Sequence, residues 1–347
     1  MNWTTQSGGA SVPVLEGAAS ARSKAPVFVL GCVRSGTTWL SHMLYSAGNF
    51  AIYRAESNVF NVLEPRVGSL RSAANKQKLL KIWQTTNMFK RTGLDMASLE
   101  PLIMADCRNG GDFLRIYMEA MARQQGVERW SDTTPEHILF LDRIQKTIPG
   151  ALVIHVIRDG RDVALSTEKQ QWIRPLPWDK GGELIAAAMF WEWMVTRGRR
   201  DGKKLGANYT EVRYEDLVLK PHETLANLSS FVWQDLDYDQ ILKVGIGSVS
   251  KPNTSFAPGN DEGEFSPLGR WKQDLSREAV VELEAMIGPT LSELNYPLAT
   301  TDAKDLDRPD LRRKRALYQA YFNSKHFLKN WSLISPLFVN RDLSWLD

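Results

Sequence analysis

A short apolar segment that ends at a glycine loop limits the fold of this chain more than any other feature. Residues 27–30 read Val-Phe-Val-Leu, a pattern typical of a buried strand, and the run stops at Gly31. Residues 37–47 carry apolar side chains at helical spacing, and Gly48 ends that pattern. Between the two lies Gly31-x4-Gly36, the spacing of a loop whose backbone N–H groups and helix N-terminus converge on an anion. The sequence therefore predicts a strand, a P-loop-like turn and a helix in succession.

Other strand patterns place this unit in a larger fold. Residues 151–157 form a nearly continuous apolar run, typical of a parallel strand covered on both faces. Residues 161–170 predict the next helix, and residues 208–213 predict a further strand. Residues 50–53 also have a strand pattern, which would make them the second strand of the chain. Alternating strands and helices predict an α/β fold, a doubly wound parallel sheet with flanking helices, whose ligands bind beyond the carboxyl ends of the strands.

The remaining regions differ in composition. Residues 1–24 are rich in Gly, Ala and Ser without the pattern of a secretory signal, and they predict a flexible leader. Residues 25–300 are expected to form one domain, within which residues 57–128 predict a variable helical cap. Residues 301–347 predict a helical extension. The basic run at residues 312–315, followed by aromatic side chains, indicates an amphipathic helix that either lies on a membrane surface or docks on its own domain or on a partner subunit.

Composition excludes several classes of protein. The 347 residues are 43% hydrophobic, enough for a large core, and a net charge of +3 argues against a nucleic-acid binder. No apolar run approaches the roughly 20 residues needed to span a bilayer. Two cysteines, Cys32 and Cys107, are too few for a disulfide framework and are compatible with a reducing compartment. We therefore expect a cytoplasmic protein without a transmembrane anchor.

The loop departs from the version that hydrolyses nucleoside triphosphates. That version follows its second glycine with a lysine for the phosphates and then with a Ser or Thr for Mg²⁺. Here Thr37 stands at the lysine's position, and the cation is Arg34 within the loop. The pattern indicates a phosphate site without a metal, in which Arg34 stabilises charge on a bridging oxygen. A glycine-rich turn can also be a simple tight connection, but the hydroxyl groups of Ser35, Thr37 and Thr38 favour anion binding.

A second candidate anion site follows the strand predicted at residues 151–157. Arg158 stands at the end of that strand, and Ser166 lies about two turns along the next helix. A cation at a strand end and a hydroxyl on the helix can share one anion. The alternative is that Arg158 forms a surface salt bridge with Asp162 while Ser166 only packs.

Both sites resemble motifs of the sulfotransferase family. Residues 34–40, Arg-Ser-Gly-Thr-Thr-Trp-Leu, resemble the family's donor loop, and Arg158-Asp159 with Ser166 eight residues after the arginine resembles its 3′-phosphate site. The resemblance covers residues 26–275 with a variable gap, and it implies 3′-phosphoadenosine 5′-phosphosulfate (PAPS) as the donor, without a metal. It implies a grip on the 5′-phosphosulfate by Arg34, Ser35, Gly36, Thr37 and Thr38. Residue 170 is a glutamine where some members carry another basic residue.

Two later segments extend this resemblance. Residues 213–217, Arg-Tyr-Glu-Asp-Leu, resemble a stretch of the family that implies a place near the nucleotide for Tyr214, which would otherwise be a core residue. Residues 269–272, Gly-Arg-Trp-Lys, loosely resemble the family's late basic segment that closes over the donor. This implies that Arg270 contacts a phosphate and that Trp271 packs beside it.

Sulfuryl transfer to a hydroxyl needs a base beside the acceptor. Several branches of the resembled family place their catalytic glutamate soon after the second strand, where this chain has Glu56, so the resemblance assigns Glu56 as the base. The alternative is a solvated carboxylate that pairs with Arg54. Other branches use a histidine, but we expect His155 to lie in the core and His137 to begin a helix. Asp132 is the alternative carboxylate.

The segment after Asp132 differs from an Asp-Lys-Thr-Pro motif found in some relatives. Thr133 occupies the position of the lysine. If that lysine positions the leaving group in the relatives, then either Arg34 alone or another cation, Lys251 or Arg270, does so here.

The resemblance implies a sulfotransferase that moves the sulfuryl group of PAPS to a hydroxyl, less readily an amine, of a small-molecule, carbohydrate or lipid acceptor. Two other hypotheses stay open: a Mg-ATP-dependent small-molecule kinase with a divergent P-loop, and a non-catalytic nucleotide- or partner-binding protein of the same fold. Any membrane contact would be peripheral, through residues 301–347. The sequence indicates no oligomeric state. Four tryptophans either line an aromatic acceptor pocket or are ordinary core residues: Trp83, Trp130, Trp172 and Trp178.

Overall fold

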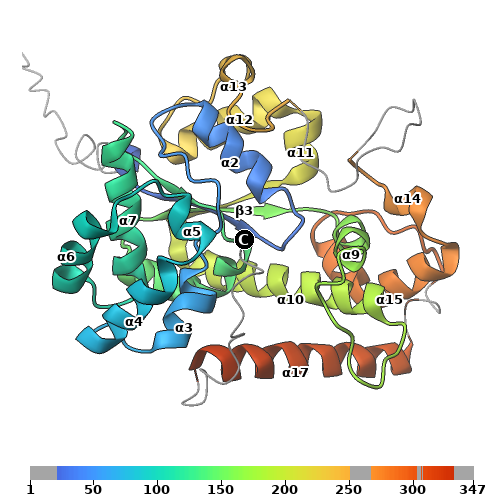
Figure 1. Ribbon diagram of the computed structural model, residues 1–347. Helices are drawn as coiled ribbons and strands as arrows, with labels where there is room; N and C mark the ends of the chain where they lie inside the picture. Colours follow the sequence, from blue (N-terminus) through green and yellow to red (C-terminus); the bar gives the residue numbers. More distant parts are fainter. Residues whose placement is uncertain (1–21, 251–266, 303–305, 307, 332–347) are drawn as a thin grey trace, which may run out of the picture.

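A parallel β-sheet runs through the middle of the molecule (Figure 1). The structure is a computed structural model that describes residues 22–250, 267–302, 306 and 308–331. Within these residues the sheet has four strands, all parallel, in the order β2-β1-β3-β4. This arrangement confirms the predicted α/β class. The strands are β1 (Val27–Gly31), β2 (Ser131–Asp132), β3 (Leu152–Ile157) and β4 (Tyr209–Arg213).

Pairing between β1 and β3 decides where the polar loops meet. The register runs from Val27 opposite Leu152 to Gly31 opposite Val156. Because the strands are parallel and in register, the loops that follow them leave the sheet at the same edge. The predicted loop at residues 31–36 and the predicted site at Arg158 are therefore neighbours.

Residues 50–53 do not form the second strand, so that prediction was wrong. Only an isolated bridge joins Phe50 to Arg129, and the strand beside β1 is β2 instead. The backbone N–H of Ile52 donates to the side chain of Gln125 at 2.8 Å, and its carbonyl accepts from the same side chain at 3.2 Å. These bonds replace ladder pairing. The apolar run has another cause, which is burial of Phe50, Ala51 and Tyr53.

Helices cover both faces of the sheet (Figure 1). Val27 and Val29 of β1 pack into the cluster on one face, and Phe28 and Leu30 pack into the cluster on the other. This alternation follows from the two-residue period of a strand. The first face is covered by α2 (Thr37–Ser46), α11 (Tyr214–Leu219), α12 (Pro221–Val232) and α13 (Tyr238–Val244), and the second by α10 (Glu183–Gly202). Further elements are η2 (Pro135–Phe140), α8 (Leu141–Thr147), α9 (Gly160–Glu168), η3 (Lys203–Asn208), α14 (Trp271–Asp274) and α15 (Arg277–Glu293).

The helices between α2 and β2 form a group at the left of Figure 1. Trp83 lies at their centre, with its ring centroid 4.8 Å from that of Phe113 and 4.9 Å from those of Phe89 and Tyr117. Trp83 is therefore a core residue. Trp130, which packs on Phe28 at 5.7 Å, is buried as well. The elements are η1 (Val59–Leu63), α3 (Glu64–Val67), α4 (Ala73–Trp83), α5 (Asn87–Lys90), α6 (Met96–Asp106) and α7 (Gly110–Gln124).

The helix α17 (Pro309–Trp331) runs along α10 at the bottom of Figure 1. Glu192 of α10 is buried and accepts hydrogen bonds from Arg315 of α17 at 2.7 and 2.9 Å. Trp193 donates to Asn323 at 2.9 Å. The described part of the C-terminal extension thus docks on its own domain. None of the helices in the described ranges has the length and apolar character to cross a bilayer.

Close packing between α9 and α10 generates a first prediction. A Cβ at Gly160 would lie 2.6 Å from the ring of Trp191, whereas a Cβ at Gly288, inside α15, would make ordinary contacts at 3.6 Å and beyond. We expect Gly160→Ala to destabilise the protein by about 1–3 kcal/mol through overpacking. The matched change Gly288→Ala should be neutral or stabilise it by up to about 1 kcal/mol, because alanine favours helix. Denaturant unfolding measures both, and equal effects would contradict this packing.

Candidate active site

The loop between β1 and α2 requires glycine at both ends of the Gly31-x4-Gly36 spacing. A Cβ at Gly31 would collide with the carbonyl oxygen of Val156 on β3, and a Cβ at Gly36 would collide with the ring of Tyr214. Gly36 also has φ 95°, a left-handed conformation that favours glycine. The loop therefore lies tightly between β3 and α11. It leads directly into the N-terminus of α2, where backbone N–H groups have no helical partner.

Arg34 connects this loop to α9. Its Nε donates to the Oγ of Ser166 at 2.9 Å, and its carbonyl accepts from Arg158 at 3.1 Å. Its guanidinium lies 5.8 Å from the ring of Trp172. Burial, followed by the charge of Arg158, lowers the pKa of Arg34. Two cations and a hydroxyl thus converge at one edge of the sheet, in an arrangement that an anion would stabilise.

Arg158 is held from three sides. It donates to the carbonyl of Pro267 at 2.6 Å, its guanidinium carbon lies 4.6 Å from the ring centroid of Tyr214, and it lies 3.8 Å from Asp162. Its Nε is buried and has no hydrogen-bond partner among the described residues. The ion pair with Asp162 was the alternative explanation of this motif. It coexists with the contacts to the loop.

The hydroxyl groups of the loop differ in exposure. Ser35 is fully buried, and its Oγ has no hydrogen-bond partner among the described residues. Thr37 is also buried, whereas Thr38 is exposed on the first turn of α2. Buried hydroxyl groups without a partner cost free energy, so such a group is a candidate ligand contact. Ser35 therefore fits a site for a phosphate or sulfate.

Residues 269–271 are tied to α9 by a side chain that sequence reasoning had not assigned to the site. The carboxylate of Asp162 accepts from the backbone N–H of Gly269 at 2.8 Å and from that of Trp271 at 3.0 Å. The ring of Trp271 lies 3.7 Å from the guanidinium of Arg161. Arg270 donates to Asp274 at 2.7 Å. A nucleotide role for Arg270 and Trp271 stays a prediction.

Glu56 has an unusual electrostatic environment for an exposed residue. The residue reaches solvent, but protein surrounds its carboxylate on most sides. This partial removal from water, followed by the negative charges of Glu136 and Asp132, raises its pKa to about 7. A carboxylate with such a pKa can take up a proton near neutral pH, which suits a general base.

A buried network positions the chain next to Glu56. Thr134 accepts a hydrogen bond from the backbone N–H of Ser57 at 2.8 Å and donates to Asp132 at 3.1 Å. The ring of His137 lies 2.7 Å from the same carboxylate, and its Nε2 accepts from the N–H of Phe60 at 3.3 Å. Burial raises the pKa of Asp132, but His137, Ser57 and Thr134 outweigh it and hold the pKa below its usual range.

The other candidate residues lie outside the reach of an acceptor. Asp132 and His137 are fully buried and bonded to each other. His155 is in the core as expected, with its ring 2.7 Å from the hydroxyl of Tyr209, and burial lowers its pKa to about 3. Thr133 is buried with no partner for its hydroxyl among the described residues. Lys251 lies outside the described residues.

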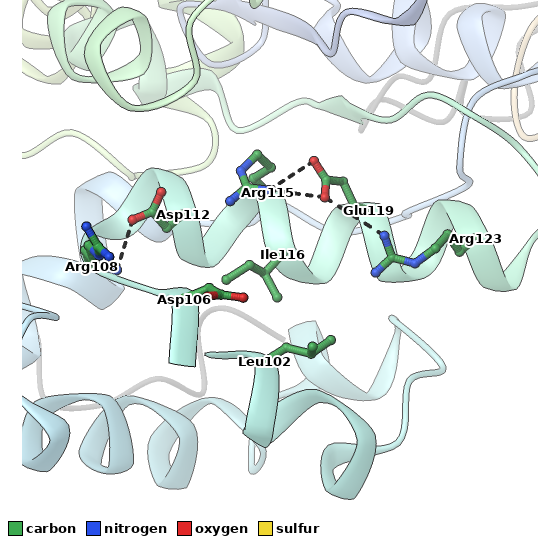
Figure 2. A pocket seen from close by; sticks show the side chains of 8 residues that line it. All are labelled: Leu102, Asp106, Arg108, Asp112, Arg115, Ile116, Glu119 and Arg123. Atoms are coloured by element: carbon green, nitrogen blue, oxygen red, sulfur yellow. Dashed lines mark hydrogen bonds and ion pairs between the residues drawn. The ribbon is translucent and has the colours of Figure 1, made fainter. Parts of the chain in front are cut away.

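Figure 2 shows the residues that line a hollow between α6 and α7. These two helices are at the left of Figure 1, and α9 and α14 are at the right. Three acidic and three basic side chains line the hollow, so their charges balance in number. Glu119 bonds Arg115 at 3.3 Å and lies 4.0 Å from Arg123, and Asp112 accepts from the backbone N–H of Arg108 at 2.9 Å. None of the residues that line this hollow belongs to the candidate site.

Sequence reasoning missed three groups that shape the site. Asp162 anchors residues 269–271, Pro267 accepts from Arg158, and Glu136 acts on the pKa of Glu56. The spacing of Arg158 and Asp162 indicated only the ion pair between these two residues. All three of the missed contacts join distant segments and leave no local pattern.

The chain is similar to several solved sulfotransferase structures. The sulfotransferase domain from the curacin biosynthetic pathway is 17% identical, with 79% of this chain and 98% of that chain covered and a TM-score of 0.48. The sulfotransferase domain of the Synechococcus PCC 7002 olefin synthase is 18% identical, with 86% and 94% covered and a TM-score of 0.45. No curated relative matches the sequence. The model of the sulfotransferase family matches residues 26–239, which is more than half of the chain. The protein therefore belongs to the sulfotransferase family.

Proposed function

We propose that the protein transfers the sulfuryl group of PAPS to the hydroxyl of an acceptor. The observation that carries this proposal is the joining of the two anion sites, because Arg34 donates to Ser166 at 2.9 Å and Arg158 donates to the carbonyl of Arg34 at 3.1 Å. PAPS carries anionic groups at both ends of its ribose. A site with two linked cationic centres fits such a donor better than it fits a single phosphate.

The residues of the site divide between the two ends of the donor. We assign the 3′-phosphate to Arg158 and Ser166, and a place beside the nucleotide to Tyr214, Arg270 and Trp271. When bound, PAPS supplies a sulfuryl group activated by its bond to a phosphate. The 5′-phosphosulfate is assigned to Arg34, Ser35, Gly36, Thr37 and Thr38.

Arg34 and Glu56 carry the chemistry in this proposal. Glu56 takes the proton of the acceptor hydroxyl while the acceptor oxygen bonds to sulfur in line with the leaving group. Arg34 stabilises the negative charge on the bridging oxygen as its bond to sulfur breaks. The products are the sulfated acceptor and 3′-phosphoadenosine 5′-phosphate (PAP). The network at Asp132 and Thr134 positions the backbone next to Glu56 and does not exchange a proton with the acceptor.

Two other functions receive less support. A kinase needs a cation after the second glycine and an acid for Mg²⁺. The first of these positions is Thr37, and the acid that follows β3, Asp159, accepts three hydrogen bonds from Arg161 at 2.7 to 3.0 Å. A non-catalytic binding protein needs no proton acceptor, and the raised pKa of Glu56 would then have no use. We propose a hydroxyl group of a small molecule, a carbohydrate or a lipid as the acceptor.

Donor binding is tested by calorimetry with PAP, compared with ATP and Mg²⁺. We expect PAP to bind without metal and ATP to bind much more weakly. Arg158→Ala should weaken PAP binding about tenfold to a hundredfold, because a hydrogen bond to a charged group contributes about 1.5–3 kcal/mol. Arg158→Lys, which keeps the charge, should lose less.

Arg123→Ala, an exposed arginine on α7, is the control for the donor experiment and should leave PAP affinity unchanged. Circular dichroism checks that the variants are folded. Preferential binding of ATP with Mg²⁺, or unchanged PAP affinity in Arg158→Ala, would sink the donor assignment.

The base is tested by single-turnover transfer from labelled PAPS across a range of pH. A general base must be deprotonated, so a pKa of about 7 for Glu56 predicts that the rate rises as pH increases through about 7 and then levels off. Glu56→Gln should lower the rate by about 10²- to 10⁴-fold and remove this dependence, while PAP affinity is unchanged. Glu100→Gln, an exposed glutamate on α6, should keep both the rate and the profile. An unaltered profile in Glu56→Gln would show that another group is the base.

A further inference from the structure

A groove of about 430 Å³ lies between α17, α10 and η2. This volume falls within the range of sites that hold a small organic molecule. The groove is separate from the contacts of the donor loop, but two of its lining residues, Trp172 and Glu136, reach the candidate catalytic groups. Trp172 lies 5.8 Å from the guanidinium of Arg34. The charge of Glu136 helps to raise the pKa of Glu56. Through these two residues, the groove lies next to Arg34 and within electrostatic range of Glu56.

The floor of the groove is aromatic. Phe190, Trp193 and Phe322 are buried, with ring centroids 5.5 to 5.8 Å apart. Two of these rings come from α10 and one from α17. Aromatic side chains that line a concave surface give a ligand a large apolar contact area. The floor suits the apolar body of a ligand.

Three buried polar atoms of the lining lack partners among the described residues, one each on Asn61, His326 and Asn330. Asn61 donates from its amide nitrogen to Asn58 and Glu136, and its Oδ1 is left without a donor among the described residues. His326 has its Nδ1 3.2 Å from the amide of Asn330, and its Nε2 has no partner in the same part of the chain. Burial lowers the pKa of His326 to about 4, so its ring is neutral. Because the amide nitrogen of Asn330 donates to Nδ1, the proton of the ring is on Nε2. The side-chain oxygen of Asn330 also has no partner among the described residues, so the lining offers two acceptors and one donor to a polar ligand group.

The charges at the groove are mostly positive. Arg174, Lys325 and Lys329 line it, and Glu136 is the acidic side chain among its described lining residues. No ion pair joins these three cations to another described residue. Lys325 and Lys329 are four residues apart, so they lie on the same side of α17. A ligand with an anionic group would complement this side.

We propose that this groove holds the sulfate acceptor and that the acceptor is a small anionic amphiphile with a hydroxyl group. Its apolar body packs on Phe190, Trp193 and Phe322, its carboxylate or other anionic group binds Lys325 and Lys329, and its hydroxyl faces Glu56. The transfer step is the one given above, so this inference rests on the proposed function. It assigns to α17 a part in acceptor selection in addition to its packing on α10.

Charge recognition is tested by calorimetry with the full-length protein, with and without PAP, using decanoate and decanol below their aggregation concentrations. We expect decanoate to bind about tenfold more tightly than decanol, because only the carboxylate of decanoate can pair with Lys325 and Lys329. The double variant Lys325→Gln, Lys329→Gln should abolish this preference. The double variant Lys325→Arg, Lys329→Arg should keep it.

The control removes two exposed charges elsewhere on the same helix, by Arg312→Gln together with Arg313→Gln, and should leave the preference intact. Equal affinity of the wild type for both compounds would overturn the inference. So would a preference that survives in the glutamine variant at residues 325 and 329, or one that the control variant also loses.

Acceptor use is tested by transfer to 10-hydroxydecanoate and to its methyl ester. We expect a kcat/KM about tenfold higher for the acid, and equal values in the glutamine variant at residues 325 and 329. Decanoate binding without any transfer to 10-hydroxydecanoate would overturn the role of the groove as the acceptor site. Absence of PAP binding would instead refute the proposed function, and the decanoate titration without PAP would still report on the groove.

Discussion

The hydrogen bond from Arg34 to Ser166, together with the bond from Arg158 to the carbonyl of Arg34, joins two loops that are far apart in the sequence. Parallel pairing of β1 with β3 makes these bonds feasible, because it brings both loops to one edge of the sheet. The arrangement places two guanidinium groups close together, and after burial the charge of Arg158 is the main cause of the lowered pKa of Arg34. A bound anion would relieve this repulsion.

The acidic side chains of the site, Glu56 and Asp132, have different electrostatic environments. Partial burial, followed by the negative charges of Glu136 and Asp132, raises the pKa of Glu56 to about 7. Asp132 itself stays ionised because it bonds His137 and Thr134. The buried carboxylate of Asp132 therefore has a structural role. The carboxyl group of Glu56 can exchange a proton near neutral pH. In our account, Arg34 stabilises the charge of the leaving group, and Glu56 takes the proton of the acceptor.

Part of this organisation could be predicted from the sequence. The strands β1 and β3 have nearly continuous apolar patterns, and the spacing of Gly31 and Gly36 and the position of Arg158 indicate the loops at their ends. The prediction of a strand at residues 50–53 was wrong, because a buried segment without strand pairing also has an apolar sequence. On the side away from β3, β1 pairs with β2, which consists of two polar residues, Ser131–Asp132, and has no strand pattern. Contacts such as that of Asp162 with Gly269 also depend on distant segments, and no local spacing predicts them.

The central claim is that one ligand with two anionic ends joins the loop after β1 to the start of α9. A crystal structure with bound PAP tests this most directly. We predict that the 5′-phosphate lies in the loop within hydrogen-bond distance of Ser35, Thr37 or Thr38, and that the 3′-phosphate contacts Arg158 and Ser166. A bisphosphate bound elsewhere, or one whose 3′-phosphate makes no contact with Arg158 and Ser166, would contradict the account.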